Sequence, residues 1–108
     1  MAYNITGYFI HIEGGEQRNQ TQFTMRARIQ LNTTNAVAAY IVFKDPWMLF
    51  ESDKVVNKVV WMYLPSSMFQ SVVDILRNEK PFNVGFNEAS GRAFLTTSSV
   101  EPVGEAES

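Results

Sequence analysis

Apolar and polar residues alternate most regularly between Thr21 and Leu31. The apolar register holds Phe23, Met25, Ala27, Ile29 and Leu31, and the polar register holds Gln22, Thr24, Arg26, Arg28 and Gln30. A period of two residues is typical of a β-strand with one buried and one solvated face. The segment therefore predicts a strand with two arginines on its solvated face.

Further strands are predicted where β-branched and aromatic residues cluster between turn-forming residues. These segments are 3–12, 36–43, 55–64, 82–86 and 92–97. Gly14 and Gly15, followed by a polar run, favour a turn that pairs the first strand with 21–31 as a hairpin. The segments 36–43 and 55–64 are apolar in both registers, apart from Asn57 and Lys58 in the second.

One amphipathic helix is predicted at about 66–78. Ser67 and Gln70 have the spacing of a capping box, and Pro81 follows the expected end. Steps of about 100° per residue place six apolar side chains in one arc of about 160°. These residues are Met68, Phe69, Val72, Val73, Ile75 and Leu76. Such a face is expected to lie on a sheet.

The predicted order is ββββαββ, in a single all-β or α+β domain over residues 1–98. An acidic, flexible tail is expected over 99–108, with Glu101, Glu105 and Glu107. One helix ahead of a terminal hairpin resembles the oligonucleotide/oligosaccharide-binding (OB) barrel, although that fold has one strand fewer before its helix. The resemblance implies a small antiparallel barrel or strongly curved sheet. The main alternative is an open antiparallel sheet with the helix across one face.

Composition excludes several kinds of chemistry. The 108 residues contain no Cys and one His, so disulfides, thiolate nucleophiles and the usual zinc sites are not expected. No metal-ligand spacing and no cofactor motif is recognised. No run approaches the ~18 apolar residues of a membrane span. The start Met1-Ala2-Tyr3-Asn4 lacks a basic and apolar leader, so a cytoplasmic protein without membrane or metal partners is expected.

His11 and Glu13 are the only pair that suggests catalysis. Two residues apart on a strand, the carboxylate could orient the imidazole as a general base. No nucleophile motif accompanies them, and a surface histidine fits the same pattern. The protein is therefore expected not to be an enzyme, with a small enzyme using His11 as an alternative.

A nucleic-acid surface is a second hypothesis. Arg26 and Arg28, flanked by Gln22 and Gln30, suit phosphate or sugar contacts across a sheet face of OB type. Tyr8, Trp61 or Tyr63 could stack on bases if the fold brings them alongside. Such binding to a single strand would weaken steeply as salt rises. The alternative is an ordinary solvated face, since the net charge is −2.

Self-association is the leading hypothesis. One helix can cover only one face of one sheet, while 36–43 and 55–64 are apolar on both. A short loop also holds four large apolar residues in a row, Trp47, Met48, Leu49 and Phe50, either as a buried connection or as an anchor for a partner. The sequence predicts a small non-enzymatic binding or assembly module that forms a homo-oligomer through apolar strand surfaces.

Overall fold

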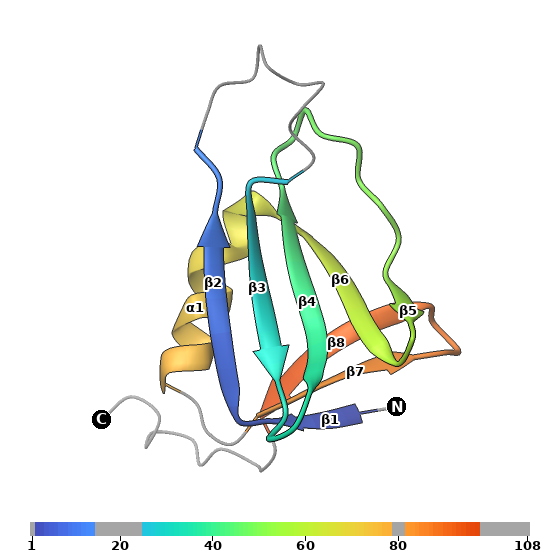
Figure 1. Ribbon diagram of the computed structural model, residues 1–108. Coiled ribbons are helices and arrows are strands. Elements are labelled where there is room, and N and C mark those ends of the chain that lie inside the picture. The colour runs from blue at the N-terminus through green and yellow to red at the C-terminus, as the bar shows by residue number, and fades with distance from the viewer. Residues whose placement is uncertain (1, 15–24, 79–81, 98–108) are drawn as a thin grey trace, which may run out of the picture.

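The computed structural model describes residues 2–14, 25–78 and 82–97, which form eight strands and one short helix preceded by a 3₁₀ turn (Figure 1). The strands are β1 (Ala2–Ile5), β2 (Gly7–Ile12), β3 (Ala27–Asn32), β4 (Val37–Lys44), β5 (Lys54–Val56), β6 (Val59–Pro65), β7 (Phe82–Asn87) and β8 (Arg92–Thr97). The helical part comprises η2 (Ser66–Met68) and α1 (Phe69–Asn78). The predicted tail, 99–108, lies outside the described residues.

The strands form two sheets, with the orders β2-β3-β4-β6-β5 and β1-β7-β8. The expected β-rich fold with one amphipathic helix is confirmed. The described strands do not close into a barrel, so the OB-like barrel is not confirmed. The antiparallel expectation also fails for one pair, because β4 and β6 are parallel. The chain returns along the sheet through residues 45–53 and forms the β5–β6 hairpin, which turns β6 into the direction of β4.

Two predicted strands are each divided in two. The segment 3–12 breaks at Thr6, which places β1 in one sheet and β2 in the other; the Thr6 N–H bonds Asn32 O at 2.8 Å. The segment 55–64 breaks at Asn57 and Lys58, whose φ angles are 52° and 68°. Two consecutive positive φ angles are those of the tight turn that joins antiparallel strands.

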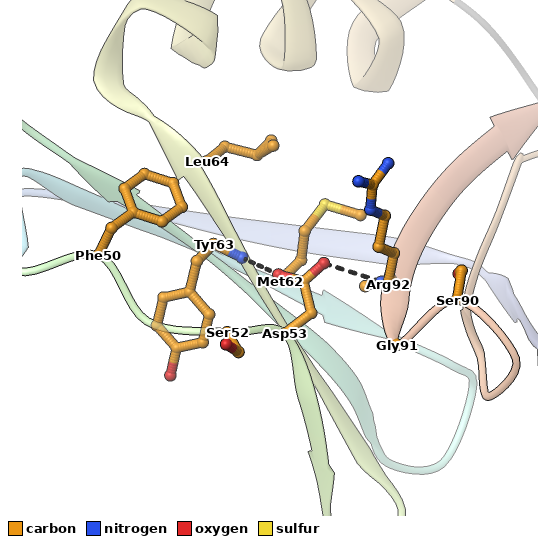
Figure 2. A pocket seen from close by; sticks show the side chains of 10 residues that line it. Phe50, Ser52, Asp53, Met62, Tyr63, Leu64, Ser90, Gly91 and Arg92 are labelled. Atoms are coloured by element: carbon orange, nitrogen blue, oxygen red, sulfur yellow. Dashed lines mark hydrogen bonds between the residues drawn. The ribbon is translucent and has the colours of Figure 1, made fainter.

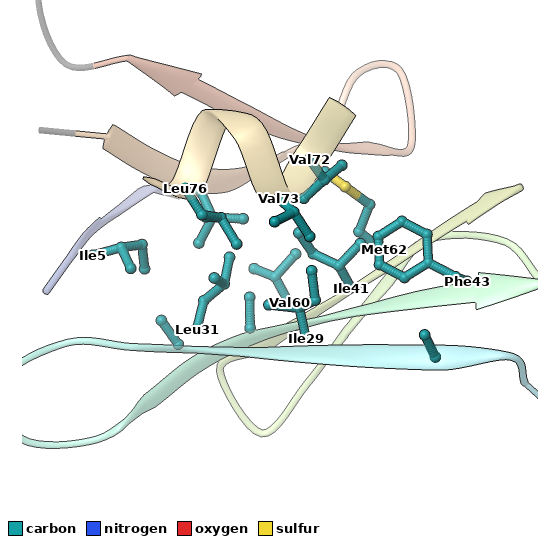
Figure 3. Packing of buried hydrophobic residues seen from close by; sticks show 14 residues of the cluster. Ile5, Ile29, Leu31, Ile41, Phe43, Val60, Met62, Val72, Val73 and Leu76 are labelled. Carbon is teal, nitrogen blue, oxygen red and sulfur yellow. The ribbon is translucent and has the colours of Figure 1, made fainter. Parts of the chain in front are cut away.

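The core lies between the five-stranded sheet and a second layer of α1 and the three-stranded sheet (Figures 1 and 3). Val72, Val73 and Leu76 of α1 are buried against it, as the helical pattern predicted, whereas Met68 is exposed. The helical segment starts after Pro65 without a side-chain capping bond, and the Gln70 amide bonds Asp74 at 2.9 Å. The predicted capping box is therefore not formed. None of the described helices has the length and apolar character that a membrane span requires.

Of the two segments that are apolar on both faces, 36–43 (β4) is largely buried within the chain itself, whereas 55–64 is covered only in part. Six of the eight β4 residues are buried, including Val42 on the face away from α1. Val42 lies between Arg28 and Tyr63 in the cross-strand register, where longer side chains shield it. The burial of β4 therefore weakens the argument that these strands need a second subunit as cover, while Val56 in 55–64 is 45% exposed, and self-association stays a prediction.

Candidate functional site

The face of the five-stranded sheet that points away from α1 is here called the outer face. On β3, Ala27, Ile29 and Leu31 are buried in the core, so alternation directs Arg28 and Gln30 to the outer face. No described helix or strand packs over this face. It is therefore the broad surface on which a ligand could lie.

Two rows of side chains cross the outer face. The first row runs Phe9, Gln30, Tyr40, Trp61 and Lys54, from β2 to β5. The second row runs His11, Arg28, Val42 and Tyr63. The fold thus brings four of the residues predicted for a nucleic-acid face, Arg28, Gln30, Trp61 and Tyr63, onto one surface.

The centre of the outer face is a stack of one cation and two aromatic rings. The Tyr40 and Trp61 ring centroids lie 4.6 Å apart with a 34° tilt. The Arg28 guanidinium carbon lies 5.0 Å from the Tyr40 centroid, which is cation–π geometry. All three side chains are half-buried, so part of each remains open to solvent. Tyr40 was missed in the sequence because its role depends on the neighbouring strands.

Arg26 does not belong to this surface. Its Nε and Nη2 donate to Asp45 Oδ2 at 3.0 and 2.8 Å, and its Nη1 donates to Glu13 O at 2.6 Å. The hydrogen bond from Arg26 lowers the pKa of Asp45. Arg26 therefore joins the ends of the β2–β3 and β4 segments, and a ligand role for it stays a prediction.

Of the other predicted ligand residues, Tyr8 is also not on the outer face. Tyr8 pairs with the buried Leu31 and so lies on the opposite face of the sheet from Trp61. It cannot stack with the aromatic residues of the outer face. Gln22 lies outside the described residues.

Tyr63 belongs to the outer face but is buried, so its ring is not open for stacking on a base. It is 7% exposed, and the Lys44 and Lys54 Nζ atoms each lie 5.8 Å from its centroid. Burial raises the pKa of Tyr63. Glu51 accepts from Lys44 at 3.1 Å and lies 3.8 Å from Lys54, and the bond from Lys44 lowers the pKa of Glu51. The buried cation Lys44 is thus neutralised inside the molecule.

His11 and Glu13 contact each other at the open end of β2, with both side chains nearly half exposed. In the described part of the chain, Glu13 is the polar side-chain partner of His11, and no hydroxyl group is bonded to it. The described residues contain no group of three or more His, Asp or Glu side chains that could hold a metal ion. His11 therefore has a carboxylate that could orient it as a general base, but no described nucleophile is bonded to it.

An open cleft of about 440 Å³ lies between β6 and the β7–β8 turn (Figure 2). Met62 and Leu64 line one side, and Arg92 reaches in from β8. Between them, the Asp53 carboxylate accepts the Tyr63 N–H through Oδ1 and the Ala93 N–H through Oδ2, each at 2.8 Å. Because its two carboxylate oxygens accept main-chain N–H groups of β6 and β8, Asp53 links the two sheets.

The apolar loop predicted as either a buried connection or an anchor is partly buried and partly exposed. Met48 is buried, with its sulfur 3.3 Å from the Asp45 nitrogen, and Trp47 is half-buried. Leu49 and Phe50 are 83% and 51% exposed. Two of the four candidate contact residues are therefore accessible to a partner.

Comparison with known proteins does not identify a family for this chain. No family model matches the sequence, and neither a curated protein nor a solved structure shows significant similarity to it.

Proposed function

We propose that this protein is a small, non-enzymatic cytoplasmic binding module that holds single-stranded nucleic acid across its outer face. The observation that carries the proposal is the half-exposed stack of Arg28, Tyr40 and Trp61 on an uncovered sheet face. Aromatic rings on a sheet stack on unpaired bases, and a neighbouring arginine pairs with phosphate or stacks on a base itself. OB proteins bind across a comparable surface, although here the sheet is open.

The arrangement favours a single strand over a duplex. The Tyr40 and Trp61 rings lie side by side with centroids 4.6 Å apart, and only unpaired bases expose a face that can stack on such rings. The cations on the outer face, Arg28 and Lys54, flank the rings on β3 and β5. Gln30 lies beside Tyr40 and can hydrogen-bond a base edge. Stacking is therefore expected to supply more of the affinity than charge does.

Fluorescence anisotropy with a labelled oligothymidylate of about 12 nucleotides at low salt tests this proposal. Trp61→Ala and Tyr40→Ala should each weaken binding about tenfold, since base stacking contributes roughly 1–3 kcal/mol per base. Arg28→Gln should weaken it less.

Two matched variants serve as controls. Arg77→Gln removes an exposed cation from α1, on the other side of the sheet, and Phe50→Ala removes an aromatic ring away from the outer face. Both should bind like the unmodified protein. Absence of binding at low salt, or equal losses from Arg77→Gln and Arg28→Gln, would contradict the proposal.

Self-association is a second candidate function, consistent with an assembly module. Exposed large apolar side chains gather in the 45–53 loop, at Leu49 and Phe50, and along β2, at Phe9 and Ile12. Few monomeric proteins leave such groups uncovered together. Light scattering at micromolar concentration should give a mass above the 12.3 kDa of one chain. A mass of one chain would remove this candidate.

A further inference from the structure

The two edges of the five-stranded sheet are unequal. β5 has three residues and carries Lys54, and short strands and lysines are devices that prevent edge-to-edge pairing. β2 has six residues, Gly7–Ile12, with no Lys, Arg, Asp, Glu or Pro among them. The β2 edge therefore lacks the protection that the β5 edge has.

The main chain of β2 has a free row of hydrogen-bonding groups. The Glu13 N–H bonds Arg26 O at 2.8 Å, so alternation directs the N–H and C=O of residues 9 and 11 toward β3. Those of Tyr8, Ile10 and Ile12 point the other way. No described strand pairs with that side of β2.

The side chains of β2 are exposed on both faces of the sheet. Phe9 is 55% exposed on the outer face, and Ile12 is 61% exposed on the core face, where Tyr8 is also exposed. Strands that are apolar on both faces usually lie inside a sheet, with neighbours on both sides. The main chain and the side chains of β2 are thus both suited to pairing with a further strand.

We propose that β2 pairs antiparallel with β2 of a second copy, about a two-fold axis at Ile10. With Ile10 opposite Ile10 of the partner subunit, the outward groups of Tyr8 meet those of Ile12 of the partner subunit. On the outer face, Phe9 lies opposite His11 of the partner subunit. This register places an apolar or aromatic neighbour beside each exposed β2 side chain. It also joins the five-stranded sheets of the two copies into one continuous sheet.

A second copy fits this edge because the register is self-complementary. No two like charges face each other, since Gly7 lies opposite Glu13 of the partner subunit. The interface is isologous, so both copies use the same edge and the assembly closes at two. The remaining edge, β5, is protected, which prevents further growth of the sheet. Leu49 and Phe50 offer side chains but no comparable row of main-chain groups. The proposal does not depend on nucleic-acid binding.

Light scattering of the full chain gives the first test. The unmodified protein should have twice the 12.3 kDa mass of one chain. Ile12→Lys should raise the dissociation constant of the dimer on the order of tenfold or more, because a lysine at an edge opposes pairing. Tyr8→Pro should do the same by removing an outward donor, since an edge strand tolerates proline where its N–H faces solvent. Leu49→Lys, a matched change in the loop, should leave the dimer intact.

Cysteine cross-linking tests the register, because the native chain has no Cys. An equal mixture of Phe9→Cys and His11→Cys proteins should form a disulfide-linked dimer on mild oxidation, since residues 9 and 11 would face each other at about 4.5 Å between Cα atoms. Each variant alone should not, because its two cysteines would be about 8 Å apart.

Three outcomes would overturn the proposal. They are a single-chain mass for the unmodified protein, dissociation by Leu49→Lys but not by the β2 variants, and cross-linking of the single variants as efficiently as of the mixture.

Discussion

The Asp53 carboxylate is a single group that connects both sheets. It accepts the Tyr63 N–H of β6 and the Ala93 N–H of β8, and it is partly buried. Asp53→Ala leaves two main-chain donors without this acceptor. Hydrogen bonds to a charged group contribute about 1.5–3 kcal/mol each, and the loss of both is not additive. We expect Asp53→Ala to lower the free energy of unfolding by about 2–4 kcal/mol, measured by urea denaturation.

Asp74→Ala is the matched control for Asp53. Asp74 is exposed on α1 and, among the described residues, accepts a side-chain bond from Gln70 of the same helix. Its loss should change the free energy of unfolding by no more than about 0.5 kcal/mol. Equal effects of the two substitutions would show that Asp53 does not hold the sheets together.

The ion pair between Arg26 and Asp45 makes stability depend on pH. The hydrogen bond from Arg26 lowers the pKa of Asp45 below its ordinary 3.8. The folded state therefore binds this proton less readily than the unfolded state, so the contribution is present above the ordinary pKa and is lost as pH falls through the folded value. The hydrogen bond from Lys44 likewise lowers the pKa of Glu51 below its ordinary 4.5, so the contribution of Glu51 is also lost as the pH falls.

Urea denaturation between about pH 5 and pH 2 measures this dependence. The free energy of unfolding should fall across the range, and Arg26→Met should make its fall shallower by removing the Asp45 contribution. Arg77→Met, which changes an exposed arginine on α1, should keep the original slope. Parallel curves for Arg26→Met and the unmodified protein would contradict the assignment.

At the scale of elements, the β5–β6 turn offers a stabilising change. Asn57 and Lys58 both have positive φ, and Lys58, at 68°, has a side chain that this conformation disfavours. Asn-Gly is the preferred pair in such turns. Lys58→Gly should raise the free energy of unfolding by about 0.5–1 kcal/mol, after the larger backbone entropy of glycine in the unfolded chain is included.

Thermal unfolding followed by circular dichroism measures the effect of Lys58→Gly. The Tyr3 hydroxyl donates to the main-chain oxygen of Lys58, so this contact survives the substitution. Lys54→Gly on the neighbouring strand, with ordinary strand geometry, should instead destabilise the protein. A lower midpoint for Lys58→Gly would show that its side chain makes a contact worth more than the relieved strain.

Local periodicity predicted the elements but not how they divide. The alternation around Ile29 identified β3, and the helical arc identified α1, because each pattern reflects one buried face. The break at Thr6 has only a weak mark, the Gly7 that follows it, since glycine inside a strand is a sign of a bulge or bend. The break at Asn57 and Lys58 had a signal, two polar residues within an apolar run. The parallel β4–β6 pair depends on the path of residues 45–53, which no short-range pattern describes.

The limited reach of local sequence patterns also explains why only part of the candidate site was predicted. Arg28 and Gln30 were found because they share the solvated register of β3. Arg26 has the same parity but lies where β3 begins and bonds Asp45 across the sheet. Tyr40 and Asp53 were missed because their partners lie 21 and 40 residues away in the chain. Their roles exist only once the strands are assembled.

At the scale of the molecule, the charge distribution sets how nucleic-acid binding should respond to salt. Of the cations on the outer face, Lys44 is 4% exposed and paired with Glu51, which leaves Arg28 and Lys54 to approach phosphates. For a single strand, log K falls with log salt by about 0.7 per neutralised phosphate, so two contacts give a slope of about −1.4. The steep salt dependence expected from the sequence assumed that Arg26 also contacts phosphate, whereas in the structure Arg26 donates to Asp45 and to Glu13 O.

Anisotropy titrations from about 25 to about 250 mM salt measure this slope. A shallow slope that Arg28→Gln reduces by about half, together with the loss of affinity in Trp61→Ala at every salt concentration, is the expected result. A slope of about −4 or steeper would mean that cations other than those of the outer face bind the strand, because two contacts cannot release so many counterions. Stacking would then be secondary, and the Arg28–Tyr40–Trp61 stack would be a part of the fold rather than a binding surface.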